Sequence, residues 1–578
     1  MFHIIGISIL GCSSFQEKDN VADQETPTCD TEEIPAQLRL LSRKEYDASI
    51  LQLYYGEGDT CLDDEQCELS ESCRFGVCRP RPCDIHTFVW PHEGDDVWIA
   101  GTFNDWEPQP MSQRDGVWVQ TLSLTPGDWV YKFVVDGTWI HDAQGDTLVD
   151  DGYGGYNNTF LLQCSAQEEI LSYPSRDIPL ESSPQHFGFR NHHSSLVTST
   201  HLLQYLIIAE TLASNIVQNE NFELVSWGEQ AFRRPLTQSE TIRYQSVDED
   251  IAVIMMLTSP HFLYRDETRS LTDYRLATAL SYFLWGAPPT KTLREQASSG
   301  ALDTPGSLID IVDDMLADPR AQQQLESFAT QWLAIEGILT VDKGTHDIFD
   351  AVRSSIYKEA GQFVADIIVS DGSIEELVTA TVDPTDDIYE TINAGVLGLP
   401  AVLASNAHSD QTSPVMRGLF VRENLLCQHL GTPPANAGGV PDVDPNSSTR
   451  ERFEQHSDDP SCAACHMYID PIGFGFEQYN EIGEWRDMDG LHPIDASGFI
   501  DGVDKLGDGS GGSFETLSEL GDHLAKSKQF STCFSDHLLR FSSGRKEIHC
   551  AAQWSTAQSP QQIIKNIILS DTFLKRTQ

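Results

Sequence analysis

The sequence predicts a multidomain protein in which a mainly α-helical region carries an inserted all-β sandwich of the immunoglobulin-like class. Apolar residues recur at i, i+3, i+4, i+7 and i+8 over residues 308–316, the spacing of one helix face, and helical patterns fill most of the chain after Cys164. Between residues 85 and 163 the spacing changes to two, and turn residues separate the short runs Val97–Ala100, Val117–Leu122 and Trp129–Val135, which are expected to be strands. A chain of 578 residues has room for about three or four domains.

The chain is strongly acidic, with 37 basic and 88 acidic residues, a formal net charge of -51 and a pI near 4.4. Such a surface repels nucleic acids and anionic membranes, so neither is an expected partner. Any membrane contact is therefore expected to come through a lipid anchor.

The first residues of the chain are apolar and end in Ile9-Leu10-Gly11-Cys12. This ending resembles the lipobox of bacterial lipoprotein signal peptides. The resemblance implies cleavage before Cys12, lipid on its thiol, and an exported protein anchored in the cell envelope, in the periplasm or at the outer membrane. The run is short and no Lys or Arg precedes it, so a frayed apolar terminus is the alternative. Residues 13–37 are acidic without periodicity, as expected for a flexible tether.

The cysteines also indicate export, because six of the 13 lie in a polar stretch that has little core to bury. Without Cys12 and the pair at positions 462 and 465, ten remain, an even number as disulfide pairing requires. We expect a disulfide-stapled module over residues 61–84, although the pairing itself cannot be derived from the sequence. The six clustered cysteines are Cys29, Cys61, Cys67, Cys73, Cys78 and Cys83.

Motifs inside the predicted sandwich resemble the glycogen-binding module of AMP-activated protein kinase β subunits and starch-branching enzymes over residues 85–163. They are Gly101–Trp106, Tyr131–Phe133, Asp136–Asp142 and Asn157-Asn158. The resemblance implies that Trp106 and Trp139 stack on glucose rings while Lys132 and Asn157 hydrogen-bond sugar hydroxyls. Tyr153 stands where that family carries a leucine. The alternative is a sandwich kept as a spacer, with its tryptophans in the core.

The stretch Cys462–His466 reads Cys-Ala-Ala-Cys-His, the attachment signal for a c-type haem. Two thiols at this spacing can each form a thioether to a haem vinyl group, and the adjacent His466 can supply an axial nitrogen to the iron. A zinc site would need a second ligand pair nearby, and a thioredoxin-like redox pair would need a preceding strand. We expect one covalent haem c held by Cys462, Cys465 and His466.

The sequence does not identify a single residue for the opposite face of the iron. A residue on the opposite face would distinguish an electron carrier from a catalyst. Met488 is the favoured candidate there, ahead of His492 and His523, and His456 and Met467 are less plausible on geometry. The stretch Asp470–Gly473, expected to be a loop, is placed to offer a carbonyl or carboxylate to the second nitrogen of His466.

Several further motifs in residues 38–54 and 165–578 resemble the planctomycete-type multidomain cytochrome-c-like proteins, whose segments are mostly domains of unknown function. These motifs are Glu229–Thr237, Leu257–Arg265, Leu280–Gly286, Gln331–Leu333, Ser413–Gly418, Ile469–Glu477 and Gly544-Arg545. The motif arginines Arg233, Arg234 and Arg265 are expected to cap helices and form buried ion pairs. The resemblance implies that the Cys-rich and sandwich modules interrupt a helical domain.

The expected organisation follows the chain in order. It comprises a lipoprotein signal (1–12), a tether (13–37), the first part of a helical domain (38–60), a Cys-rich module (61–84), a glycogen-binding-like sandwich (85–163), the continuation of the helical domain (164–245), a second helical domain (246–400), the haem domain (401–505) and a C-terminal helical domain (506–578).

The predicted function is that of a cell-envelope monohaem cytochrome-like protein engaged in electron transfer or in haem-dependent oxidation, and the sequence does not decide whether it is a haem-dependent oxidoreductase. The sandwich would target it to α-glucan or another polysaccharide. The alternative is a surface carbohydrate-binding lipoprotein in which the haem is structural or absent. The redox partner protein cannot be derived from the sequence.

Overall fold

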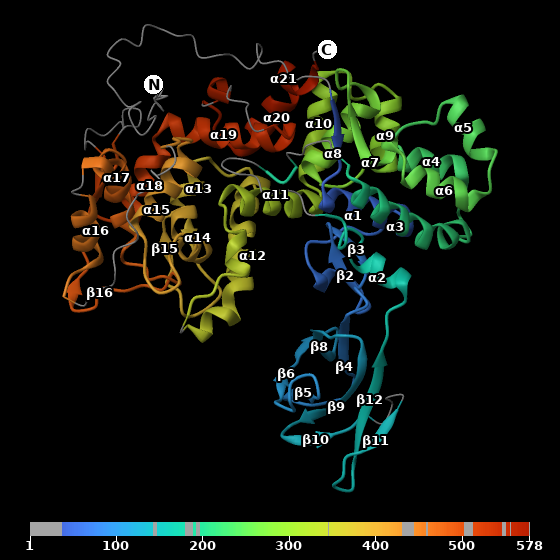
Figure 1. Cartoon of the computed structure of the whole chain (residues 1–578), viewed down its shortest axis with the longest axis horizontal. Helices are drawn as coiled ribbons and strands as arrows, with labels where there is room; N and C mark the ends of the chain where they lie inside the picture. The colour runs from blue at the N-terminus through green and yellow to red at the C-terminus, as the bar shows by residue number, and fades with distance from the viewer. Residues whose placement is uncertain are drawn as a thin grey trace, which may run out of the picture.

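The computed structural model describes residues 37–142, 147–179, 189–191, 197–344, 346–430, 444, 446–457, 460–501, 512–545, 551–554 and 556–576. The predicted lipoprotein signal with Cys12 and nearly all of the tether lie outside these residues. The protein is multidomain, with helices forming its larger body and several small sheets, and the sandwich extends from that body as a separate arm (Figure 1). No helix among the described residues is both long and apolar enough to span a membrane.

The first described segment joins elements far along the chain. Strand β1 (Gln37–Leu40) pairs antiparallel with β13 (Tyr264–Glu267). Helix α1 (Arg43–Tyr55) follows and begins at Ser42, whose side chain forms a capping box with Glu45. Its apolar face shares one buried cluster with α3 (Ser199–Val217), α4 (Leu224–Ala231), α6 (Glu249–Leu257) and α7 (Pro260–Leu263). Chain on both sides of the sandwich therefore builds one core.

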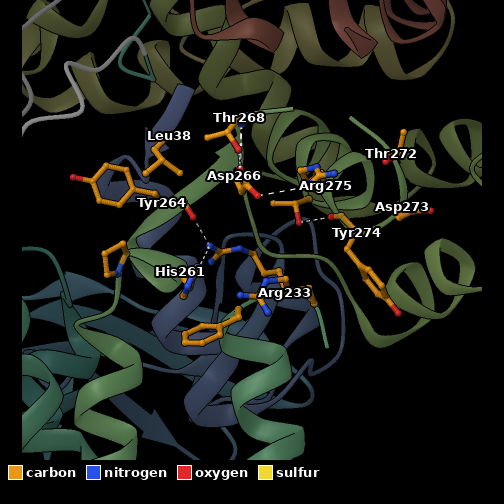
Figure 2. A pocket seen from close by; sticks show the side chains of 14 residues that line it. Leu38, Arg233, His261, Tyr264, Asp266, Thr268, Thr272, Asp273, Tyr274 and Arg275 are labelled. Atoms are coloured by element: carbon orange, nitrogen blue, oxygen red, sulfur yellow. Dashed lines mark hydrogen bonds and ion pairs between the residues drawn. The ribbon is translucent and has the colours of Figure 1, made fainter. Parts of the chain in front are cut away.

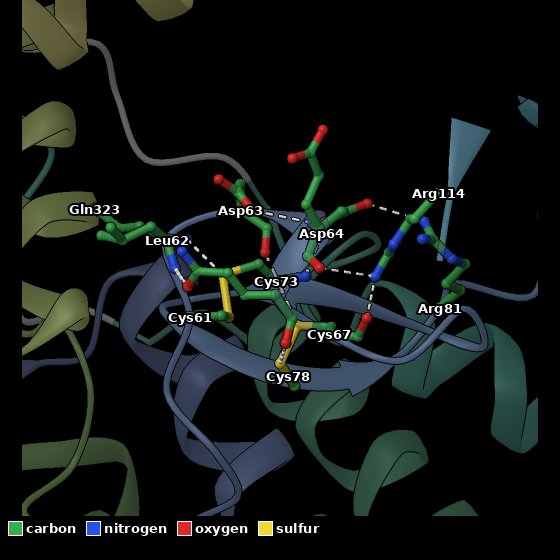
Figure 3. Close-up of a disulfide and its surroundings, with 12 residues drawn as sticks. Cys61, Leu62, Asp63, Asp64, Cys67, Cys73, Cys78, Arg81, Arg114 and Gln323 are labelled. Carbon is green, nitrogen blue, oxygen red and sulfur yellow. Dashed lines mark hydrogen bonds and ion pairs between the residues drawn. A yellow bond between two sulfur atoms is a disulfide. The ribbon is translucent and has the colours of Figure 1, made fainter. Parts of the chain in front are cut away.

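Two small disulfide-bonded strands link this core to the arm. Strands β2 (Glu71–Arg74) and β3 (Val77–Pro80) form a hairpin that is stapled by Cys61–Cys73 and Cys67–Cys78 (Figure 3). A third disulfide, Cys83–Cys164, closes the neck of the arm across 81 residues of sequence. Disulfides thus do hold the Cys-rich module, and Cys164 belongs with them.

The arm contains two antiparallel sheets around their own core. One sheet has the order β11-β12-β9-β5-β6, with β10 also on β9, and the other has the order β4-β8-β7. The runs predicted at residues 97–100, 117–122 and 129–135 are confirmed as β5, β8 and β9. The strands are β4 (Ile85–Trp90), β5 (Val97–Gly101), β6 (Gln109–Pro110), β7 (Ser112–Arg114), β8 (Val117–Ser123), β9 (Gly127–Val135), β10 (Thr138–Ile140), β11 (Leu148–Asp150) and β12 (Tyr156–Leu162).

The rest of the chain is a helical body around one large apolar cluster. The helix face predicted at residues 308–316 is confirmed, because all five of its apolar residues are buried in α10. The further helices are α2 (Ala166–Ser172), α5 (Gln238–Gln245), α8 (Asp273–Leu284), α9 (Lys291–Ser298), α10 (Pro305–Leu316), α11 (Pro319–Trp332), α12 (Asp347–Val369), α13 (Glu376–Thr379), α14 (Pro400–Ser405), α15 (Pro414–Phe420), α16 (Thr449–Ser457), α17 (Pro460–Gly473), α18 (Leu517–Ala525), α19 (Lys528–Ser543), α20 (Pro560–Leu569) and α21 (Asp571–Leu574).

One local prediction is wrong: Asp470–Gly473 is the last turn of α17 and not a loop. Pro471 lacks the N–H of an interior helical bond and would normally disrupt the turn. Tight packing against α15 supports it instead. A Cβ on Gly473 would lie 1.9 Å from the Pro414 carbonyl oxygen, and a Cβ on Gly418 would lie 2.2 Å from that of Ile469. The two helices approach too closely for larger side chains at these positions.

Candidate haem site and carbohydrate-binding face

Helix α17 carries the Cys-Ala-Ala-Cys-His motif, and two buried arginines anchor the backbone around it. Arg422 Nε donates to the Tyr468 carbonyl oxygen within α17 at 2.9 Å. Arg417 donates to the carbonyl oxygens of Phe476, Tyr479 and Asn480, just beyond the helix, at 2.7–2.8 Å. Guanidinium groups satisfy several carbonyls at once, so these contacts hold the helix in place.

His466 makes the defining contact of this site. Its Nδ1 lies 3.0 and 3.1 Å from the two carboxylate oxygens of Asp470, four residues on along the same helix face. The hydrogen bond to Asp470 raises the pKa of His466 above 6.5, and burial opposes it only in part. With Nδ1–H donated to a carboxylate, the tautomer places the lone pair on Nε2, the nitrogen that would bind a metal. The predicted partner on the second nitrogen is thus a side-chain carboxylate.

A hollow of about 590 Å³ opens beside this pair. Its lining includes Met467, Phe474 and Phe499, which give it apolar walls, and Arg450. The Arg450 guanidinium lies 4.2 Å from the centre of the Phe474 ring and donates to the Asp495 carbonyl oxygen at 2.9 Å. The apolar part of this lining suits a flat hydrophobic group, and Arg450 suits a carboxylate on that group, although Glu454 and Asp470 also line the hollow. Neither Arg450 nor the two phenylalanines were singled out from the sequence, since no local pattern distinguishes them.

Of the two motif cysteines, the structure describes the side chain of Cys465 only. Cys465 directly precedes His466 and is disulfide-bonded in this structure. The side chain of Cys462 lies outside the described ones. A thioether and a disulfide cannot share one sulfur, so Cys465 must be reduced before haem attachment. The residue types, their spacing and the orientation of His466 fit a c-type haem.

Three of the predicted distal candidates, Met488, His492 and His523, lie elsewhere among the described residues. Met488 is in β16 (Met488–Asp489), opposite Pro493 of β17 (His492–Pro493), and its side chain is 42% exposed. His492 belongs to the same hairpin, and His523 Nε2 donates to the Ser513 carbonyl oxygen at 2.8 Å. The described lining of the His466 hollow includes Met467 and none of these three. A distal role for Met488 stays a prediction.

The sandwich brings its four predicted sugar-binding residues onto or beside one face. In β9, Phe133 and Val135 point into the core, so Lys132 and Val134 lie on the other face. Trp139 is paired with Val134 and therefore shares that outer face. Asn158 is paired with Tyr131, which places Asn157 across from Lys132.

The two tryptophans lie at the surface of the arm and not in its core. Trp139 is 46% exposed, and its ring centre is 6.3 Å from that of Trp106. Neither ring is among the buried residues of the sandwich core. Adjacent indoles at a mutual tilt of 46°, one half-buried (Trp106) and one exposed (Trp139), offer flat apolar surfaces of the kind that pack on sugar rings. The alternative in which they form the core is therefore wrong.

Lys132 also organises a neighbouring loop. Its Nζ lies 2.7 Å from Asp151 Oδ2, and Asp151 Oδ1 accepts the backbone N–H groups of Tyr153 and Gly155 at 2.9 Å. The hydrogen bond from Lys132 lowers the pKa of Asp151 to about 2. The loop presents Tyr153 with 97% of its side chain exposed. Lys132 therefore supports the loop in addition to any contact with a sugar.

The motif arginines perform the structural roles expected of them. Arg233 Nη2 donates to the carbonyl oxygens of His261 and Tyr264 at the end of α7, at 2.9 and 2.8 Å (Figure 2). Arg234 pairs with Glu240 at 2.8 Å, and Arg265 with Glu45 at 3.2 Å. Arg233 and Arg234, which line a pocket of about 410 Å³, therefore already have protein partners.

Three family models match parts of this chain. Residues 271–391 match PSD4, a protein of unknown function (DUF1592), and residues 393–489 match PSCyt3, a protein of unknown function (DUF1588). Residues 85–168 match the glycogen recognition site of AMP-activated protein kinase. The second of these segments contains α17 with its motif, and the third is the sandwich arm.

Curated relatives match over the region of the arm. The pig 5'-AMP-activated protein kinase subunit beta-1 is 37% identical over 76 residues, which are 13% of this chain and 62% of the relative. The mouse beta-1 subunit is 27% identical over 143 residues (22% and 51%), and the human beta-2 subunit is 30% identical over 140 residues (21% and 51%). The chain thus spans about half to three fifths of the lengths of these relatives. Together the matches confirm both resemblances: this polypeptide combines planctomycete-type cytochrome-c-like domains of unknown function with an inserted glycogen-binding module.

Proposed function

We propose that this protein is a monohaem c-type cytochrome-like protein of the bacterial cell envelope that works at a polysaccharide surface. The observation that carries the proposal is the His466–Asp470 pair on α17, with Nδ1 held at 3.0 Å and Cys465 adjacent. A buried carboxylate on the second nitrogen is the usual companion of a metal-binding histidine. The segment that matches PSCyt3 includes the whole motif.

Different residues would bind different parts of the haem. Cys462 and Cys465 would provide the thioethers and His466 the proximal nitrogen, while Asp470 keeps the imidazole oriented. Arg450 is suited to a carboxylate at the mouth of the hollow, and Phe474 and Phe499 exclude water from its walls. The bound haem would supply one-electron chemistry, either electron transfer or oxidation.

The arm would bring that chemistry to a glucan. Trp139 and the half-buried Trp106 form an aromatic surface, and Lys132 and Asn157 lie beside it with donors and acceptors for hydroxyl groups. The three disulfides of the arm and its neck are typical of exported proteins. Export with a lipid on Cys12 is part of the same proposal.

Haem attachment is tested by producing the protein together with a cytochrome c maturation system. We expect haem stain on a denaturing gel, and a reduced absorption spectrum typical of a c-type haem. Cys462→Ala/Cys465→Ala should abolish the stain, while Met467→Leu, a change at the next position of the same helix, should keep it. A wild-type protein without covalent haem, or a double variant that retains it, would overturn the haem proposal.

Glucan targeting is tested by retention on amylose resin. We expect the wild type to be retained and Trp106→Ala/Trp139→Ala to elute freely, because the aromatic surface is removed. Trp485→Phe, a change at an exposed tryptophan outside the arm, serves as the matched tryptophan control and should be retained like the wild type. Wild-type protein that binds neither amylose nor glycogen would reduce the arm to a spacer.

The second candidate function is a surface carbohydrate-binding lipoprotein without haem. The disulfide at Cys465 favours it, because a motif locked in that form takes up no haem. Mass spectrometry of protein purified from its native membrane distinguishes the two. A mature mass that includes haem supports the cytochrome, and a mass with an oxidised cysteine pair and no haem supports the binding protein.

A further inference from the structure

Asp470 is the most constrained polar group of the candidate haem site. It is 4% exposed, and both of its carboxylate oxygens lie within 3.1 Å of His466 Nδ1. Since the two residues are one helical turn apart, the contact needs no special backbone geometry. Burial of a carboxylate is costly, so its position against the imidazole calls for a functional reason.

The helix end prevents Asp470 from moving away from His466. The next residues, Pro471 to Gly473, are wedged against α15, where Gly473 leaves no room for a Cβ beside the Pro414 carbonyl. Ile472 is fully buried in the main apolar cluster. A carboxylate fixed in this way interacts with the imidazole at all times rather than only in some conformers.

Another charged pair lines the same hollow without touching the imidazole. Arg450 lies 3.8 Å from Glu454 and 3.7 Å from Asp495. Glu454 therefore carries the same formal charge as Asp470 within one hollow, but it forms an ion pair with Arg450. This difference separates the effect of a hydrogen bond from that of charge alone.

We propose that Asp470 is a positioning residue that makes the His466 imidazole electron-rich and so gives the haem a low reduction potential; the inference rests on the proposed haem function. A carboxylate acceptor draws the Nδ1 proton toward itself, which increases the basicity of Nε2. A more basic axial nitrogen stabilises Fe(III) relative to Fe(II) in the one-electron couple. The site would then act as a low-potential electron donor and not as a high-potential carrier.

The test is the midpoint potential of the haem-loaded protein in an equilibrium redox titration. Asp470→Asn keeps the shape and an acceptor oxygen but removes the charge. We expect it to shift the equilibrium at least tenfold toward Fe(II), which is about 59 mV upward for one electron. Glu454→Gln removes a charge from the same hollow and should shift the equilibrium less than threefold. Asp470→Glu retains a carboxylate and should stay within threefold of wild type.

The outcomes separate this inference from the function on which it rests. Haem content is first measured by the pyridine haemochrome assay, and wild type without haem would overturn the proposed function together with this inference. If haem is present at full content and the midpoint potential of Asp470→Asn shifts no more than that of Glu454→Gln, only the role of Asp470 is overturned and the proposed haem function stands. If Asp470→Asn does not fold, Asp470→Glu decides: a shift of tenfold or more toward Fe(II) in that variant contradicts the proposal.

Discussion

Replacing Glu267 by Gln tests how the N-terminal segment is joined to the helical body. Glu267 ends β13 and is buried. Its Oε1 lies 3.4 Å from Arg39 Nη1 in β1 and 3.9 Å from Arg265 Nε, and its Oε2 lies 2.8 Å from Arg576 Nη2 near the C-terminus. Glu267→Gln would leave these buried guanidinium groups with one negative charge fewer.

The size of the effect follows from the pKa of Glu267. Burial alone raises this pKa, but the positive charges of Arg39, Arg265 and Arg576 outweigh burial and lower it from 4.5 to about 2. That difference corresponds to about 3 kcal/mol in favour of the folded state. Removing one partner of a buried ion pair costs about 3–5 kcal/mol in general. Because the folded-state pKa is lowered, this stabilisation is fully present above pH 4.5 and is lost as the pH falls toward about 2.

The assay is thermal unfolding of the disulfide-intact protein, followed by near-UV circular dichroism. A loss of this size lowers the midpoint of a domain of this kind by on the order of 10 °C. Glu295→Gln is the matched control, since Glu295 is exposed and lies 3.9 Å from Lys291 across one helical turn. Exposed pairs contribute about 0–1 kcal/mol. If Glu267→Gln and Glu295→Gln unfold at the same midpoint temperature, the ion pairs of Glu267 do not stabilise the contact between β1, β13 and the C-terminal segment.

The remaining predictions concern the two candidate sites and the neck. In the haem-free protein, Asp470→Asn should lower the pKa of His466 toward 6.5, because the hydrogen bond that His466 donates to Asp470 raises it; an unchanged pKa by NMR titration would contradict the contact. Asp151→Ala should speed hydrogen exchange at the Tyr153 and Gly155 amides, because their N–H groups donate to Asp151 in the wild type. Exchange rates equal to wild type would show that the loop is held by other contacts. Cys83→Ser/Cys164→Ser should destabilise the arm by about 2–4 kcal/mol, since that disulfide closes a long loop; chemical denaturation is the check, and a loss below about 1 kcal/mol would argue against it.

Much of the local structure was predictable because its signals are local. The helix face of α10 and the strands β5, β8 and β9 follow from the spacing of apolar residues, which repeats within a few positions. The expected loop at Asp470–Gly473 failed because proline and glycine normally end a helix. Contacts with α15, more than fifty residues earlier in the chain, override that preference.

In the candidate sites, too, residues in local motifs were predictable and residues brought together by folding were not. The motif cysteines and His466 were found by their spacing alone, and Asp470 was expected as a partner only within a short stretch. Arg450, Phe474 and Phe499 were not found, because segments separated by loops meet at the hollow. For the arm, the motif residues were predictable, whereas the exposure of Trp139 next to Trp106 and the role of Lys132 at the Tyr153 loop required the tertiary structure.

The sequence by itself determined the helical and two-residue periodicities, the cysteine and histidine spacing and the two family resemblances. Only the tertiary structure decided that β1 pairs with β13 across the inserted arm, that Cys83 pairs with Cys164, and that a carboxylate orients His466. The physical reason is the range of the forces involved. Periodicity and attachment motifs depend on neighbours along the chain, whereas pairing depends on which distant segments bury apolar surface and charge together once the loops between them close.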